Sequence, residues 1–101
     1  MNKIQILEVL KKVYDPEVGV NIVDLGLVYK VEIKPDEVYI QITMTSPTCP
    51  LHGVIIRNMD SVLRAAFTLL REMTIELVWE PPWSPDLMSD TAKEQLGWKR
   101  G

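Results

Sequence analysis

The hydrophobic positions of this chain repeat first with the period of a helix and then with that of a strand. Apolar side chains recur every three or four residues over 3–14, which predicts an amphipathic helix. Asn2 and Gln5 have the spacing of a capping box at its start. Asp15-Pro16 is expected to end the helix, because proline disfavours the helical conformation in the residue before it.

Two runs of alternating apolar and polar residues follow. Residues 27–34 and 38–45 place a hydrophobic side chain at every second position, as half-buried strands do. The turn residues Pro35 and Asp36 separate these strands so closely that we expect a β-hairpin. The segment 15–26 shows neither period, but it carries enough apolar residues to lie against the core.

The remaining residues predict a second helix, a third strand and a short helical tail. A long apolar face over about 50–70 indicates a helix. The alternation over 74–80 indicates a strand parallel to the preceding one, because the helix between them reverses the chain. Consecutive prolines keep the next segment extended, and helical turns are expected at 85–88 and 89–96. The order α-β-β-α-β with a helical tail predicts a two-layer α+β domain, in which two helices pack on a small three-stranded sheet.

Composition and charge narrow the class of protein. A chain of 101 residues has too little material for a second core, so we expect one domain over 1–101, with its core in about 3–80 and a tail rich in proline and tryptophan in 81–101. The net charge of −3 and the scattered basic residues argue against a nucleic-acid partner. No apolar run approaches the roughly 20 residues that cross a bilayer, and a single cysteine excludes an internal disulfide. We therefore expect a soluble cytoplasmic protein with no nucleic-acid or membrane partner.

The candidate chemistry is concentrated between the second strand and the second helix. Pro50 suits the first position of a helix, so the only cysteine, Cys49, is expected at the helix start. Unpaired backbone N–H groups and the helix dipole can lower a thiol pKa there from about 8.5 to between about 3.5 and 7.5. The only histidine, His52, could add positive charge or relay a proton. Nearby hydroxyls belong to Thr45, Ser46 and Thr48. A lone cysteine can equally be a small buried hydrophobe, so its position leaves both interpretations open.

The segment before the hairpin holds a second, acidic candidate set: Asp15, Glu17 and Asp24. These carboxylates could orient a ligand, a proton or a basic group of a partner. Structural roles are as simple, because Asp15 could end the first helix and Asp24 could accept from backbone N–H groups in the turn before Gly26. Packing of the tail on the core explains the tryptophans more simply than a binding platform does; they are Trp79, Trp83 and Trp98.

Four short motifs together resemble a known family. They are Asp15-Pro16-Glu17, Val23-Asp24-Leu25-Gly26-Leu27-Val28, Thr45-Ser46-Pro47-Thr48-Cys49-Pro50 and Pro81-Pro82-Trp83. In this order and at these separations they resemble the SufT/PaaD-type (MIP-like) domain associated with iron–sulfur cluster assembly, over roughly residues 3–96. The resemblance implies the α-β-β-α-β fold and a role in maturing iron–sulfur proteins, in which clusters are delivered to client apoproteins.

The resemblance also implies which residues act. The marked cysteine of the family corresponds to Cys49, and its acidic and hydroxyl positions correspond to Asp15, Glu17, Asp24, Thr45 and Ser46. A thiolate is a suitable iron ligand, but one cysteine cannot complete the usual four-thiolate ligation of a cluster. His52, a second subunit, a client or a small thiol would have to supply the remaining ligands of a transient or dimer-shared cluster. Alternatively, Cys49 holds no cluster and acts through thiol chemistry or contact. The phenylacetate-pathway branch has additional C-terminal cysteines that this chain lacks, which favours a general assembly factor.

These observations lead to one hypothesis and two alternatives. We expect a non-catalytic assembly or carrier factor with Cys49 as its functional thiolate, whose partners are iron–sulfur assembly proteins and client apoproteins. One thiol per chain also makes a homodimer attractive. A cysteine-dependent enzyme would use Cys49 as nucleophile and His52 as base. A pure adaptor would bind clients through Pro81-Pro82-Trp83 and the acidic segment.

Overall fold

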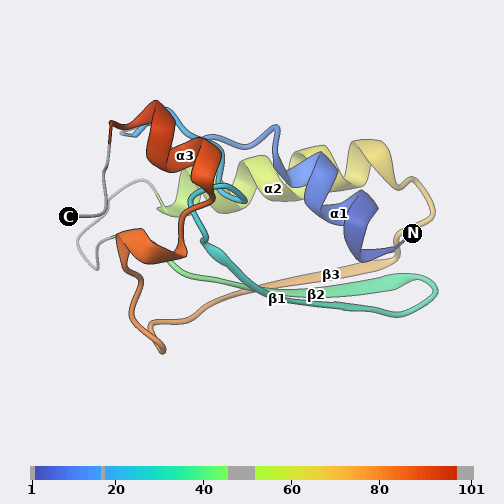
Figure 1. Cartoon of the computed structure of the whole chain (residues 1–101). Helices are drawn as coiled ribbons and strands as arrows, with labels where there is room; N and C mark the ends of the chain where they lie inside the picture. The colour runs from blue at the N-terminus through green and yellow to red at the C-terminus, as the bar shows by residue number, and fades with distance from the viewer. Residues whose placement is uncertain (1, 17, 46–51, 98–101) are drawn as a thin grey trace.

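The helices and strands occur in the predicted order. The computed structural model describes residues 2–16, 18–45 and 52–97. Its elements are α1 (Lys3–Leu10), β1 (Val28–Ile33), β2 (Glu37–Ile42), α2 (His52–Ala66), β3 (Glu72–Leu77), the 3-10 helix η1 (Pro85–Leu87) and α3 (Asp90–Gln95). Figure 1 shows α1 and α2 on the same side of the sheet. The predicted two-layer α+β arrangement is confirmed.

The sheet has the strand order β1-β2-β3. Strands β1 and β2 are antiparallel, whereas β3 runs parallel to β2 in an unbroken register from Glu37 opposite Glu72 to Ile42 opposite Leu77. The register of β1 shifts between Val28 and Lys30, which leaves Tyr29 as an extra residue at a β-bulge. The predicted hairpin and the parallel third strand are both confirmed.

The first helix is shorter than its apolar pattern predicted. The capping box of Asn2 with Gln5 is present, but α1 ends at Leu10 rather than at residue 14. The peptides that follow take part in a different pairing: Ile22 N donates to Val13 O at 2.9 Å, and Asp15 N donates to Val20 O at 3.0 Å. Residues that pair across a loop in this way cannot also continue the helical ladder.

The other boundaries also shift by a few residues. Helix α2 ends at Ala66, where residue 70 was expected, and β3 runs over Glu72–Leu77 instead of 74–80. Strand β3 starts earlier than expected because Arg71 N and Glu72 N both donate to Asp36 O in the hairpin turn. The tail turns are close to their predicted places, and Ser89 caps α3 by accepting from Ala92 N at 3.1 Å.

The hydrophobic core lies between the helices and the sheet. Its largest fully buried apolar side chains are Ile6, Leu10, Val13, Ile22, Leu25, Leu27, Ile40, Ile42, Ile55, Met59 and Leu63. The tail contributes Met88 and Ala92 to the same cluster, so the core extends past residue 80. None of the helices in the described part of the chain has the length and apolar character needed to cross a membrane.

Candidate functional site

Only some of the predicted site residues can be placed. Glu17, Ser46, Thr48 and Cys49 lie outside the described residues. The connection that contains Cys49 starts after Thr45, beyond the end of β2, and enters α2 at His52. The first turn of α2 holds no acidic residue that would neutralise the positive end of its dipole. Stabilisation of a Cys49 thiolate at this helix start stays a prediction.

Asp15 is at the corner of a tight loop. Its side chain is only 1% exposed, and its carboxylate accepts from Val18 N at 3.4 Å. Its carbonyl oxygen accepts from Gly19 N at 2.7 Å, and Gly19 has a φ of 77°, a conformation that favours glycine. Because α1 ends five residues earlier, at Leu10, Asp15 organises this loop and does not end the helix as one alternative proposed.

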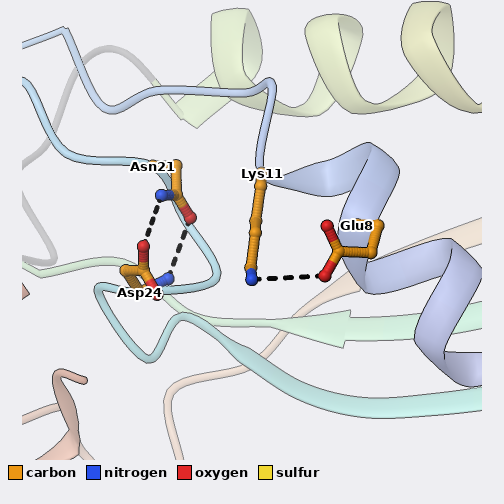
Figure 2. A network of polar contacts seen from close by, with 4 residues as sticks. All are labelled: Glu8, Lys11, Asn21 and Asp24. Atoms are coloured by element: carbon orange, nitrogen blue, oxygen red, sulfur yellow. Dashed lines mark hydrogen bonds and ion pairs between the residues drawn. The ribbon is translucent and has the colours of Figure 1, made fainter. Parts of the chain in front are cut away.

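Asp24 forms a reciprocal pair with Asn21 (Figure 2). The Asn21 Nδ2 amide donates to Asp24 Oδ2 at 2.7 Å, and the Asp24 backbone N donates to Asn21 Oδ1 at 2.9 Å. The Asp24 carboxylate was expected to accept from backbone N–H groups, whereas in the structure it accepts from the side-chain amide of Asn21. Asparagine and aspartate three residues apart favour such turns, and this spacing in the sequence could have indicated the pair.

The C-terminal tail is tied to the loop that contains Asp24. Ser89 N donates to Asp24 O at 2.7 Å, and the Trp83 indole Nε1 donates to Leu25 O at 2.7 Å. Gly26 has a φ of 78°, and a Cβ on it would collide with the backbone oxygen of Leu87. Trp83 is half-buried against the core, as its packing interpretation predicted. We call this set of contacts between residues 24–26 and 83–89 the tail clamp.

A cleft of about 320 Å³ lies beside the clamp. It is lined by Thr43, Met44, Thr45, Trp79, Pro82 and Trp83. Of these lining residues, Trp79 is 42% exposed, whereas Thr43 is only 1% exposed. The cleft therefore groups Thr45 with the tryptophans, directly before the connection that carries Cys49. Neither Asp15 nor Asp24 lines this cleft. The loop that contains Asp24 is connected to it by the hydrogen bond from Trp83 Nε1 to Leu25 O.

A tyrosine fixes the other side of this region. The Tyr29 hydroxyl, on the β1 bulge, donates to Pro81 O at 2.8 Å. Burial raises the pKa of Tyr29 above its ordinary value of 10.0. The nearby Thr43 hydroxyl opposes this rise in the Tyr29 pKa. Thr43 Oγ1 nevertheless makes no hydrogen bond in the described structure. The prolines before Trp83 are thus held at the edge of the sheet.

One chain offers few side chains of the kind that ligate iron–sulfur clusters. Across residues 2–16, 18–45 and 52–97, no three histidine, cysteine, aspartate or glutamate side chains are grouped so that they could hold a metal ion. The whole sequence has one cysteine and one histidine. This donor set does not fit an iron–sulfur cluster held by one chain alone, because such clusters take four protein ligands.

Comparison with known proteins decides the family. Residues 3–76 match the family described as iron-sulfur cluster assembly protein. The chain belongs to this family. It is 42% identical over 96 residues to the Fe-S protein maturation auxiliary factor YitW of Bacillus subtilis, an alignment that covers 94% of this chain and 93% of that relative. It is 43% identical over 86 residues to the Fe-S protein maturation auxiliary factor SufT of Staphylococcus aureus, with 84% and 97% covered.

A solved structure supports the same assignment. The crystal structure of a domain of unknown function, DUF59, from Bacillus anthracis has a TM-score of 0.91 and 40% identity to this chain. The match covers 96% of this chain and 92% of the Bacillus anthracis chain. The family resemblance and the fold expected from the sequence are confirmed. The roles of Cys49 and of the acidic residues stay predictions.

Proposed function

We propose that this protein is an auxiliary factor in the maturation of iron–sulfur proteins, which assists cluster delivery to client apoproteins through the thiolate of Cys49. The observation that supports it most is the match along nearly the whole chain to two proteins named as Fe-S protein maturation auxiliary factors. An auxiliary role in iron–sulfur protein maturation follows from the family. Delivery through one thiolate is the finer step that we add.

A single thiolate suits a cluster that is cargo. The chain has one cysteine, so Cys49 can ligate one iron and the other ligands must come from a donor, a client or a small thiol. A cluster held at one corner is released when client thiolates replace the remaining ligands and finally Cys49. The dipole of α2, uncompensated by acidic residues in its first turn, would keep the Cys49 sulfur ionised and ready to bind iron.

Partners and compartment follow from the same chemistry. Cluster delivery requires contact with assembly proteins on one side and client apoproteins on the other. A lone cysteine stays a free thiol most readily in a reducing compartment. We therefore place the protein's activity in the cytoplasm.

The test compares two variants in cluster transfer. A donor protein loaded anaerobically with a [4Fe–4S] cluster is mixed with an apo-dehydratase client, and recovery of client activity is followed with and without this protein. Cys49→Ser should remove most of the stimulation, because a hydroxyl is a poor iron ligand. Ser61→Ala, on the exposed surface of α2, is the matched control and should behave as the wild type. Full stimulation by Cys49→Ser would show that this thiol is not used.

The adaptor alternative is favoured by one observation, the cleft beside Thr45. Trp79 lines this cleft and is 42% exposed overall, whereas Trp83 is held by its hydrogen bond to Leu25 O. Trp79→Ala is thus the informative change, because loss of Trp83 would also disturb the tail clamp. A pure adaptor would lose client binding in Trp79→Ala and keep both binding and stimulation in Cys49→Ser. The cysteine-enzyme alternative gains no support from the described residues.

A further inference from the structure

Strand β3 forms an open edge of the sheet. Among the described residues it pairs only with β2, in a register without a break. The opposite edge strand, β1, is interrupted by the bulge at Tyr29. Bulges are one of the devices that keep a sheet edge from pairing with another strand, and β3 has neither a bulge nor a proline. The two edges are therefore not equivalent, and β3 is the one able to accept a further strand.

The hydrogen bonds to β2 identify which peptides face outward. Glu72 N donates to Asp36 O at 3.3 Å and Val78 N donates to Ile42 O at 2.8 Å. Peptide groups alternate in direction along a strand, so the backbone N–H and C=O groups of the even-numbered residues of β3 point toward β2. The N–H and C=O groups of Met73, Ile75 and Leu77 consequently point to the open edge. The same three residues carry the half-buried apolar side chains of β3.

A cleft runs between this edge and α2. It is about 340 Å³ and is lined by Ile56, Arg57, Asp60, Met73 and Ile75. Its apolar lining comes from both layers of the domain. The two charged residues come from neighbouring positions on α2, and the Asp60 carboxylate also accepts from Arg64 Nε at 2.9 Å. The edge thus combines unpaired peptide groups, an apolar stripe and one charge of each sign.

We propose that β3 pairs antiparallel with β3 of a second copy of this chain, which joins the two sheets into one of six strands. A two-fold axis at Ile75 places Ile75 opposite itself, Met73 opposite Leu77 and Thr74 opposite Glu76. An axis at Thr74 would instead place Glu72 opposite Glu76 twice, and like charges directly opposite destabilise a strand pair. Charge therefore favours the register centred on Ile75 over the one centred on Thr74.

The charges on α2 fit the same symmetry. A two-fold axis runs the two copies of α2 in opposite directions, so that Arg57 of each copy faces Asp60 of the other. An isologous interface of this kind must be self-complementary, and one cation beside one anion satisfies that condition. The apolar side chains of Met73, Ile75 and Leu77 from both copies then form one stripe under the two helices.

This dimer keeps the two cysteine-bearing connections apart. Ile75 lies opposite Ile40 of β2, and Thr45 follows Ile40 by five residues. At about 3.3 Å per residue, each connection starts roughly 16 Å from the axis, and the two starts are roughly 33 Å apart along the strands. The dimer is therefore independent of thiol and metal, and a cluster shared by two Cys49 thiolates would need a different contact. The inference does not rest on the proposed function.

The test measures the dimer dissociation constant by sedimentation over a wide range of protein concentration, with reductant and chelator present. Arg57→Glu should weaken the dimer about tenfold, because two attractive contacts become repulsive. Adding Asp60→Arg to that variant should restore much of the affinity. Ile75→Pro should prevent dimerisation, because it removes an outward N–H group that takes no part in the β2 ladder. Cys49→Ser is the control that should dimerise as the wild type does.

A second measurement guards against a variant that merely unfolds. In the wild type, hydrogen exchange at the amides of Met73, Ile75 and Leu77 should slow as protein concentration rises. A wild type that is monomeric at all concentrations, or a dimer that Cys49→Ser abolishes and Arg57→Glu does not, would overturn the proposal. Protection of these amides only after a client apoprotein is added would also overturn it, and would assign the edge to an extended client segment.

Discussion

Two glycines with nearly the same backbone conformation allow the tail clamp to be measured. Gly19 and Gly26 have φ values of 77° and 78°, so alanine at either position is strained in the same way. A Cβ at Gly19 would have no atom within 4 Å, whereas a Cβ at Gly26 would collide with the backbone of Leu87. The difference between Gly26→Ala and Gly19→Ala therefore isolates the contact between the loop and the tail.

The magnitudes follow from what each change disturbs. Gly19→Ala should lower the free energy of unfolding by about 1 kcal/mol, the cost of a left-handed alanine. Gly26→Ala must in addition push the tail away from the loop. That movement strains two hydrogen bonds worth about 1 kcal/mol each, from Ser89 N to Asp24 O and from Trp83 Nε1 to Leu25 O. It also begins to expose Met88, which is 6% exposed. We expect a total loss of about 3 to 5 kcal/mol for Gly26→Ala.

Urea unfolding followed by tryptophan fluorescence is the assay. The two variants should differ by at least about 2 kcal/mol, and their melting temperatures by at least about 8 °C for a domain of this size. Cluster-transfer stimulation should fall with Gly26→Ala and persist with Gly19→Ala, if the clamp supports the region beside Thr45. Equal losses of stability in the two variants would refute the clamp, because only the backbone strain would then matter.

Two further predictions concern side chains that hold the same region. Trp83→Phe should lower the free energy of unfolding by about 1 to 3 kcal/mol, because Leu25 O loses its indole donor; Trp79→Phe, at an exposed site, is the control and should cost less than about 0.5 kcal/mol in the same urea assay. Because burial raises the pKa of Tyr29, its contribution to stability is present below the unfolded-state pKa near 10.0 and is lost as pH rises through the higher folded-state pKa. Urea midpoints measured from neutral pH to above pH 10 should therefore fall more steeply for the wild type than for Tyr29→Phe, and parallel curves would contradict this assignment.

The sheet and its helices were predictable because their signals are local. The alternation in 27–34 and 38–45 and the turn at Pro35 specified the hairpin. The end of α1 was not predictable in the same way. The apolar spacing continues to Tyr14, but the peptides of residues 13–15 pair with those of 20–22, and this pairing lies across a loop. Nonlocal hydrogen bonds overrode a helical pattern that was otherwise sound.

The site was predictable in its chemistry more than in its contacts. The position of Cys49 between a strand and a helix follows from the chain order alone. The tail clamp depends on contacts between distant parts of the chain that no sequence period reports. Trp83, which contacts a carbonyl 58 positions away, illustrates this limit. From the sequence, packing of Trp83 was the simpler interpretation, but its partner was hidden.

The tail clamp changes what the family motifs mean. Asp24-Leu25-Gly26 and Pro81-Pro82-Trp83 were taken from the sequence as two separate marks of the family. In the fold they belong to one contact, because Asp24 O and Leu25 O accept from the tail and Gly26 admits the Leu87 backbone. Two of the four motifs thus have a structural explanation, and the Asp24 carboxylate already bonds Asn21. The functional group is therefore more reasonably sought in the segment after Thr45. Cys49 lies there, and it is the one cysteine in the sequence that could ligate iron as a thiolate.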